Sequence, residues 1–447
     1  MIFRIVLCIA LLLFPPVARA ESISLIQDEE TERVLASFLI PLFKTAGLNP
    51  DEMKIHLVKD DSINAFAAKG LHVFIHTGLL TKADNAQEVV AVLAHETGHI
   101  AGGHIVRLYD NIRIAKRNML LSMLLAGIAG VASRRGDVGM AAMMGAQTSA
   151  QSLLMGYRRT EENAADQFAV SLLAKTGHGI VGFEEMMKKL RRQEDYQIDP
   201  KTDIIWQTHP DVRDRLAFIV DQKDKIPPEN KRLIARENKA FKNVQAKLYA
   251  FLYDPAKTFA KFPESDTSFP ARYARAVATY RASEYERAVA DINALIKEFP
   301  ENPYLYELKG QISFETGKNA DAIKAYKTAV RLLPDAALFR IGLAQAQTES
   351  DKREDWLDAL DTLRTAGQYM ADSPFIWRLF AVAYGKTGQY PMADYALAEY
   401  NFHISDDKQA AFFAQKALKE LPESAAAAQK ARDILDQATK KHSLKKR

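Results

Sequence analysis

The chain has almost no cysteine and almost no net charge. Its single cysteine, Cys8, lies within the first twenty residues, so the rest of the chain can form neither a disulfide nor a thiolate metal site. The 60 Lys and Arg residues against 56 Asp and Glu residues leave a formal charge of only +4, too little to indicate a nucleic-acid-binding protein. We therefore expect no nucleic-acid partner, and any metal ion must be held by His and carboxylate side chains.

The first twenty residues have the pattern of a secretory signal peptide. Arg4 precedes an apolar run over residues 5–14, and residues 18–20 read Ala-Arg-Ala, an A-x-A cleavage site. The run is shorter than the roughly 20 residues that span a bilayer. We expect cleavage after Ala20 and export to the bacterial periplasm; the alternative is an uncleaved N-terminal anchor.

Hydrophobic periodicity predicts a mainly α chain that begins with an α+β domain. Apolar residues recur at helical spacing over residues 30–46 and 86–108. Between these helices, strand-like runs at 54–58, 64–67 and 71–76 predict a small antiparallel sheet.

A Met- and Ala-rich segment follows at residues 119–154, and its first part, 119–132, carries no charge. That part is too short to indicate a transmembrane helix. Two interpretations stand: buried or lid-like helices packed over the preceding domain, or a hydrophobic loop that touches a membrane surface or a substrate.

The last part of the chain shows an internal repeat. Pro300 and Pro334 both end helical patterns and lie 34 residues apart, which is the period of the tetratricopeptide repeat. Small and aromatic residues between them occupy the signature positions of that repeat: Gly310, Gly317, Ala322, Tyr326 and Ala329. The interval from Pro334 to Pro374 is longer, so the third unit is degenerate. Stacked helix pairs of this kind form an α-helical solenoid with a concave protein-binding face, although helical hairpins without binding are the alternative.

These patterns divide the 447 residues into four parts. We expect a signal peptide at 1–20, a first domain at 21–225, a linker helix region at 226–268 and a tetratricopeptide-repeat domain at 269–447.

The main chemical motif is His95-Glu96-Thr97-Gly98-His99, which matches H-E-x-x-H within a predicted helix. Histidines at i and i+4 lie on one helix face, so both imidazoles can reach one zinc ion. Glu96 lies beside them, where it can act as a general base toward water.

A second element supplies a third ligand. Glu162 and Asp166 are four residues apart, so on a helix they share one face. Glu162 is the predicted third ligand, and Asp166 can hold the second ring nitrogen of a ligand histidine. Glu161 is the rival ligand, but its spacing from Asp166 directs it elsewhere.

Two further histidines are candidates for the site. His104 follows His99 by five residues, which misses the spacing of a third metzincin ligand, so a helix-end or supporting position is the preferred interpretation. His209 precedes Pro210 in a loop-like segment, where it would stabilise an oxyanion, occupy the open coordination position, or have no contact with the site.

These motifs resemble the gluzincin metallopeptidases that include the CAAX prenyl protease and the bacterial heat-shock protease HtpX. The resemblance covers about residues 30–225 and rests on five segments: Asn64-Ala-Phe-Ala67, Thr77-Gly-Leu-Leu80, His95-Glu-x-x-His99, Glu162-x-x-Ala-Asp166, and His209-Pro with Arg215. It implies a zincin-type fold with one zinc ion per chain, an approach of His209 to the zinc, and a bracing role for Arg215.

With a signal peptide before it and the repeats behind it, the whole chain resembles members of this family that act in outer-membrane protein assembly, and this resemblance implies a protease and chaperone. Its clients would be unfolded or misassembled outer-membrane proteins, and its partner the β-barrel assembly machinery, bound through the repeats. We expect an extended substrate to add as a strand at the sheet edge formed by Val73, Phe74 and Ile75.

A second hypothesis is a repeat-based chaperone or scaffold whose protease site is held latent. The intact H-E-x-x-H motif with Glu162 favours an active endopeptidase. The apolar segment 119–154 and His209 favour latency.

Overall fold

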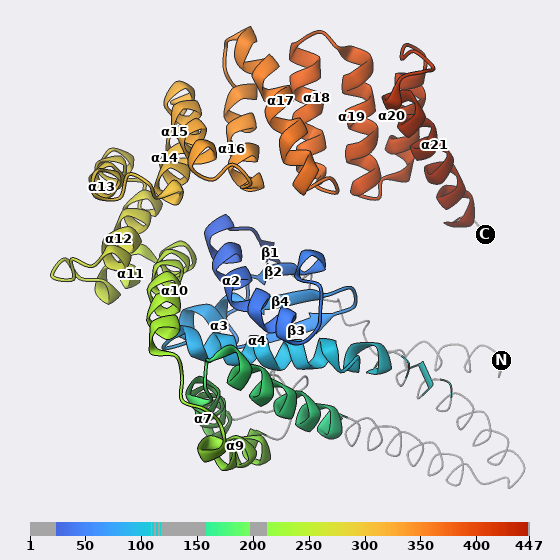
Figure 1. Cartoon of the computed structure of the whole chain (residues 1–447). Helices are drawn as coiled ribbons and strands as arrows, with labels where there is room; N and C mark the ends of the chain where they lie inside the picture. Colours follow the sequence, from blue (N-terminus) through green and yellow to red (C-terminus); the bar gives the residue numbers. More distant parts are fainter. Residues whose placement is uncertain are drawn as a thin grey trace, which may run out of the picture. The chain divides into compact units, whose positions relative to one another are not determined.

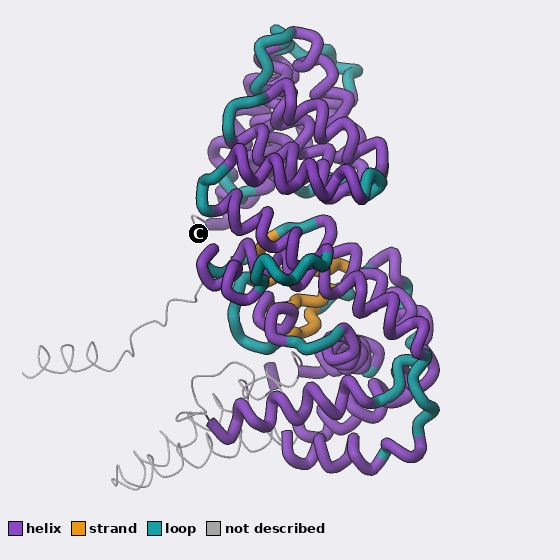
Figure 2. Tube along the Cα trace, turned by 90° about the vertical axis from the view of Figure 1, so that its left-hand side faces the viewer, coloured by secondary structure: helices purple, strands orange, loops and turns teal. Residues whose placement is uncertain are grey.

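The computed structural model describes residues 24–108, 110, 113–114, 117, 158–196 and 212–445. The expected signal peptide, the apolar segment 119–154 and His209 lie outside these residues. Helices dominate the described chain and the strands gather in one place, as Figure 2 shows. The predicted fold class, mainly α with one small sheet, is therefore confirmed. No described helix combines the length and apolar character that crossing a lipid bilayer requires.

The chain divides into two compact units. Unit 1 contains the residues up to Gln27 together with Leu39–Glu229, and unit 2 contains Asp28–Phe38 together with Asn230–Arg447. Helix α2 (Glu29–Thr45) therefore contributes residues to both units.

Unit 1 contains a four-stranded sheet in the order β1-β2-β4-β3 (Figure 1). Its strands are β1 (Leu25–Ile26), β2 (Lys54–Val58), β3 (Ala65–Ala68) and β4 (His72–His76). Strand β2 pairs with β4 in parallel, whereas β3 and β4 form an antiparallel hairpin in which Phe66 lies opposite Phe74. The expected strands are present, but the expectation of a purely antiparallel sheet is wrong, because the hairpin returns β4 to the direction of β2.

Strand β4 lies inside the sheet rather than at its edge. Its backbone pairs with β2 on one side and with β3 on the other, so the prediction that Val73, Phe74 and Ile75 form an edge for substrate is wrong. Val73 and Ile75 are fully buried, which is the environment of a central strand. The edge strand next to β4 is β3.

The helices of unit 1 are α3 (Thr77–Lys82), α4 (Ala86–Ala101), residues 158–176, α7 (Val181–Tyr196) and α9 (Val212–Asp221), with 3-10 turns at Pro50–Glu52 and Lys223–Lys225. Helix α3 packs against β4 and α4 packs against β3, whereas α7 packs on α4 and α9 packs on α7. Helix α4 begins after Asn85, whose side chain accepts a hydrogen bond from the N–H of Glu88. The sequence predicts one helix over 86–108, but the chain leaves the helix at Gly102 and Gly103 and becomes helical again at residue 104.

Unit 2 is a stack of helices joined by short turns. Its members are α10 (Lys231–Leu252), α11 (Pro255–Lys261), α12 (Phe269–Arg281), α13 (Tyr285–Glu298), α14 (Pro303–Glu315), α15 (Asn319–Leu332), α16 (Ala337–Thr348), α17 (Arg353–Tyr369), α18 (Pro374–Lys386), α19 (Tyr390–His403), α20 (Asp407–Leu418) and α21 (Ala426–Lys445). From α12 onward they form successive pairs, and the degenerate third repeat still forms the pair α16 and α17. One core cluster joins Ala246 of α10 to Tyr273 and Leu308 of the repeats, so the segment expected as a linker packs within unit 2.

The start of α2 is held by buried charges of unit 2. The ammonium group of Lys247, on α10, lies 2.5 Å from Oδ2 of Asp28 and 3.5 Å from Oε2 of Glu30. The hydroxyl of Tyr273 donates to Oε2 of Glu30 over 3.1 Å. Lys247, Glu30 and Tyr273 are all almost fully buried, so these groups depend on one another for their polar partners.

Candidate metal centre

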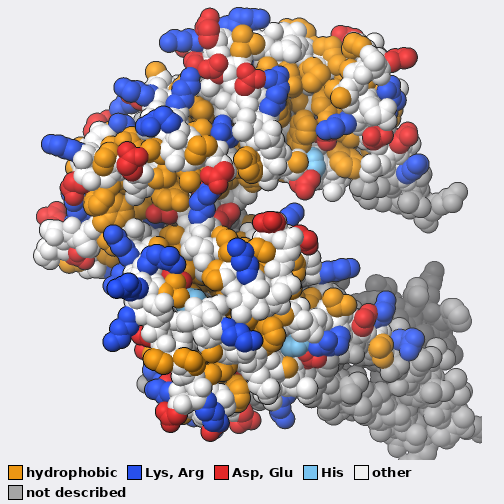
Figure 3. Space-filling model, viewed as in Figure 1, with side chains coloured by type: hydrophobic (Ala, Val, Ile, Leu, Met, Phe, Trp, Pro, Cys, Tyr) orange, Lys and Arg blue, Asp and Glu red, His pale blue; other side chains and the backbone are white. Residues whose placement is uncertain are grey.

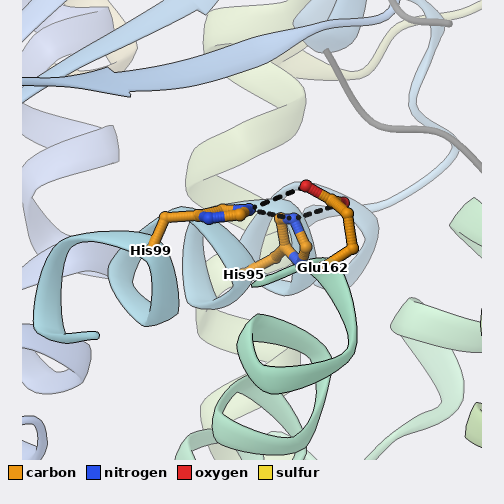
Figure 4. Close-up of side chains that lie close together, drawn as sticks. All are labelled: His95, His99 and Glu162. Carbon is orange, nitrogen blue, oxygen red and sulfur yellow. Dashed lines mark hydrogen bonds and ion pairs between the residues drawn. The ribbon is translucent and has the colours of Figure 1, made fainter. Parts of the chain in front are cut away.

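Three side chains from two helices converge in unit 1. His95 and His99 project from α4, and Glu162 projects from helix 158–176, with its carboxylate directed at both imidazoles (Figure 4). The Nε2 atoms of His95 and His99 lie 2.9 Å apart, and the Glu162 oxygens lie 3.3 Å from Nε2 of His95 and 3.1 Å from Nε2 of His99. All three side chains are buried.

The donor set fits a divalent metal ion. Two nitrogens and one carboxylate oxygen all lie within 4.8 Å of one another, so one ion can reach all three atoms. Two imidazoles and a glutamate are the protein ligands of one class of catalytic zinc site, in which the remaining position is left to water or substrate.

A close helix crossing brings Glu162 to the histidines. A Cβ atom at Gly98 would lie 2.9 Å from the backbone oxygen of Ala165 and 3.2 Å from its Cα atom. Any larger residue at position 98 would push the two helices apart. The glycine inside the H-E-x-x-H motif therefore permits the approach that the ligand set requires.

The second ring nitrogen of His95 has a carboxylate partner. Nδ1 of His95 lies 2.8 Å from Oδ1 of Asp166, the residue that the sequence proposes for this position. A contact of this kind selects the ring tautomer whose Nε2 is available to a metal.

Arg215 contacts two of the three acidic residues of helix 158–176, Glu162 and Asp166. Its guanidinium donates to both oxygens of Asp166, over 2.8 and 2.9 Å, and lies 3.0 Å from Oε2 of Glu162. Burial opposes ionisation of Asp166, but Arg215 and the hydrogen bond with His95 outweigh it and lower its pKa to about 2. Asp166 is therefore a carboxylate throughout the ordinary pH range.

Glu96 lies beside the metal ligands and against the edge strand. Its Oε2 accepts a hydrogen bond of 2.9 Å from the N–H of Ala67, on β3. A cavity of about 230 Å³ opens here. The described residues that line it are Phe66, Ala67, Glu96, His99, His104, Ile105, Leu108, Arg158, Glu161 and Glu162. The general-base candidate thus faces a space next to the ligands.

The remaining candidates separate into two groups. His209 lies outside the described residues, so the structure does not test whether it stabilises an oxyanion, occupies the open coordination position or has no contact with the site. His104 contacts His99, and Glu161 contacts His104 and Arg107 rather than joining the three converging ligand atoms. The sequence did not predict the link between His104 and Glu161; the Gly102-Gly103 pair, which interrupts the helix before His104, was the only local signal.

Comparison with known proteins agrees with this geometry. The family sequence model of peptidase family M48 matches residues 27–223. The family sequence model of the tetratricopeptide repeat matches residues 273–337 and 314–369. These matches confirm the predicted pairing of a peptidase domain with repeats.

Several relatives carry names that describe a protease. The beta-barrel assembly-enhancing protease of Yersinia pestis is 23% identical over 314 residues, which cover 66% of this chain and 60% of the relative. The protein of the same name from Escherichia coli K12 is 23% identical over 348 residues, covering 76% of this chain and 69% of the relative. Metalloprotease YcaL of Escherichia coli K12 is 28% identical over 194 residues, covering 41% of this chain and 68% of the relative.

Proposed function

We propose a function for this metallopeptidase, which carries a peptidase family M48 domain at residues 27–223: it is a periplasmic zinc endopeptidase and chaperone of outer-membrane protein assembly. Its substrates would be misfolded or stalled outer-membrane proteins. The observation that carries the proposal is the convergence of His95, His99 and Glu162 beside Glu96. The names of the relatives that match both parts of the chain support the link to barrel assembly.

Each residue of the site has a chemical task in this proposal. Zinc held by His95, His99 and Glu162 would supply Lewis-acid activation of a water molecule and of the scissile carbonyl. Glu96 would take a proton from the attacking water and pass it to the leaving amine. His209 stabilises the oxyanion, and Asp166 and Arg215 hold the ligands in place.

Strand β3 is the part of the sheet available to an extended substrate. Its inner edge pairs with β4, and the N–H of Ala67 is directed away from β4, toward Glu96. The N–H and C=O of one residue in an antiparallel strand face the same side, so both polar groups of Ala67 face the site. A substrate strand bound there would be held through its main chain, which tolerates many sequences.

Unit 2 offers apolar surface for protein partners. Large hydrophobic side chains are exposed on its later helices and in the turn after α19: Leu357, Tyr369, Phe375, Tyr390, Ile404 and Phe412. Figure 3 shows hydrophobic side chains gathered over the helices α17–α20. Exposed apolar surface of this kind is typical of protein-binding sites, which supports binding of the assembly machinery and of unfolded clients. A further contact of segment 119–154 with a membrane surface is part of the proposal.

The first experiment tests the chemistry with a urea-denatured outer-membrane porin as substrate. The zinc-loaded wild-type chain should cleave it, a chelator should stop cleavage, and added zinc should restore it. Glu96→Gln should lower the cleavage rate by at least about 100-fold, because the general base is lost, while zinc stays bound. Glu52→Gln, on an exposed 3-10 turn, is the matched control. Appreciable cleavage by zinc-loaded Glu96→Gln would show that Glu96 is not the general base.

The second experiment tests the partners. Glu96→Gln should retain clients that the wild type degrades, so purification of this variant from cell envelopes should recover outer-membrane proteins and components of the assembly machinery. If the zinc-loaded wild type does not cleave porin but still prevents its aggregation, the chain is mainly a repeat-based chaperone with a latent site.

A further inference from the structure

The break after helix α4 turns His104 back toward the metal ligands. The helix ends at Ala101, and Gly103 has a φ of 67°, a left-handed conformation that favours glycine. A Cβ atom at Gly102 would lie 2.3 Å from Nε2 of His104, so the imidazole occupies the space that a side chain would need. In an uninterrupted helix, a residue five positions after His99 would point about 140° away from it.

His104 contacts the ring nitrogen of His99 that does not face the other ligands. Nε2 of His99 is directed at His95 and Glu162, and its Nδ1 lies 2.9 Å from Nδ1 of His104. The two rings stand nearly perpendicular, at 81°. His104 therefore lies behind His99, on the side away from the convergent ligand atoms.

A carboxylate holds the far side of His104. Nε2 of His104 lies 2.6 Å from Oε2 of Glu161, and the guanidinium of Arg107 lies 2.9 Å from the same oxygen. Both His104 and Glu161 are largely shielded from solvent, whereas Arg107 is about half exposed at the rim. The ion pair thus fixes Glu161 in the position from which it reaches His104.

Proton positions along this chain of contacts follow from one requirement. A metal bound at Nε2 of His99 leaves the ring proton on Nδ1, which must then donate to Nδ1 of His104. His104 consequently carries its own proton on Nε2 and donates it to Glu161. The carboxylate of Glu161 selects the tautomer of His104, and His104 selects that of His99.

We propose, building on the function proposed above, that His104 with Glu161 is a positioning pair for the metal ligand His99. Asp166 does the same for His95 directly, and both carboxylates come from helix 158–176, the helix that supplies Glu162. One helix thereby provides a ligand and aligns both histidines.

Zinc affinity of the full-length chain tests this proposal, measured by competition with a chromophoric chelator. His104→Leu should weaken binding by about 10- to 100-fold, as loss of a partner behind a ligand histidine does. His104→Gln, whose amide can accept from His99 and donate to Glu161, should recover most of the affinity. The zinc affinity of Glu161→Gln should lie between those of His104→Leu and His104→Gln. Gly102→Ala displaces His104, so its zinc affinity should resemble that of His104→Leu. His403→Leu in unit 2 is the matched control.

The visible absorption spectrum of the Co²⁺-loaded protein supplies a second readout, because it reports ligand geometry and not folding. His104→Leu should shift its bands, and His104→Gln should restore them. Wild-type zinc affinity and Co²⁺ bands in both His104→Leu and Glu161→Gln would overturn the proposal. Should His104→Leu fail to fold, Glu161→Gln and His104→Gln decide the question. A wild-type chain that binds no zinc would instead refute the proposed function.

Discussion

Nδ1 of His95 and Oδ1 of Asp166 lie 2.8 Å apart, although 71 positions separate the two residues. The contact turns Nε2 of His95 toward His99 and Glu162. Because the guanidinium of Arg215 donates to both oxygens of Asp166, neither the carboxylate nor the imidazole can rotate without breaking buried polar contacts. The geometry of the ligands is thus prepared by residues that do not bind the metal themselves.

Asp166→Asn should weaken zinc binding by about 10- to 100-fold, since the amide cannot hold His95 and Arg215 with a full negative charge. It should also lower the free energy of unfolding by about 3–5 kcal/mol, because Arg215 stays buried without one of its partners. Chelator competition and chemical denaturation measure the two effects. Asp214→Asn, on the exposed side of α9, should change neither, and an equal loss there would contradict the assignment.

Gly98→Ala should separate helix α4 from helix 158–176, because the new methyl group would lie 2.9 Å from the backbone oxygen of Ala165. We expect weaker zinc binding and a loss of about 1–3 kcal/mol of stability from overpacking. Gly385→Ala is the matched control: this glycine also lies in a helix, and no atom lies within 4 Å of the added methyl group. The control should be neutral or slightly stabilising, by up to about 1 kcal/mol. Unaltered zinc affinity in Gly98→Ala would show that the crossing tolerates a side chain.

Lys247→Met should destabilise unit 2 by about 3–5 kcal/mol, because Asp28 and the buried Glu30 lose their shared positive partner. Denaturant unfolding of the full chain measures the loss. The exposed pair of Arg364 and Asp361 provides the comparison, and Arg364→Gln should have little effect because solvent already screens that pair. Equal stabilities of the two variants would mean that Lys247 is not needed to hold the start of α2.

The stability of unit 2 should fall as the pH rises from about 4.5 to 7. Burial raises the pKa of Glu30 to about 7, an effect that Asp28 strengthens and Lys247 opposes. In this pH window the folded chain holds a proton that the unfolded chain has released, so unfolding becomes easier as the pH rises, by up to about 3 kcal/mol. Burial opposes ionisation of Asp28, but Lys247 outweighs it and lowers the pKa of Asp28, so its contribution is lost as the pH falls and has the opposite pH dependence.

Unfolding curves of Glu30→Gln at pH 5 and pH 7 test this, because the amide has no proton to release. The wild type should lose more stability than this variant between the two pH values. Identical losses would show that Glu30 ionises normally in the folded protein.

Local sequence patterns determined the positions of most strands, of the repeats and of the candidate metal ligands. Strand periodicity located β2, β3 and β4 to within a residue at most ends, and the 34-residue period located the repeats. The i, i+4 spacings of His95 with His99 and of Glu162 with Asp166 selected side chains that the fold brings together. Such features depend on neighbours within one or two turns of chain, so they can be read from the residues themselves.

Only the tertiary structure decided which surfaces meet. It placed β4 inside the sheet and β3 at the edge, because β4 pairs with both β2 and β3 and its Val73 and Ile75 are fully buried. It joined the start of α2 to unit 2 through Lys247, and it brought Glu161 to His104 across a break at Gly102. In each case the outcome depends on the burial of charge or apolar surface between segments distant in sequence, and no local pattern encodes the identity of such a partner.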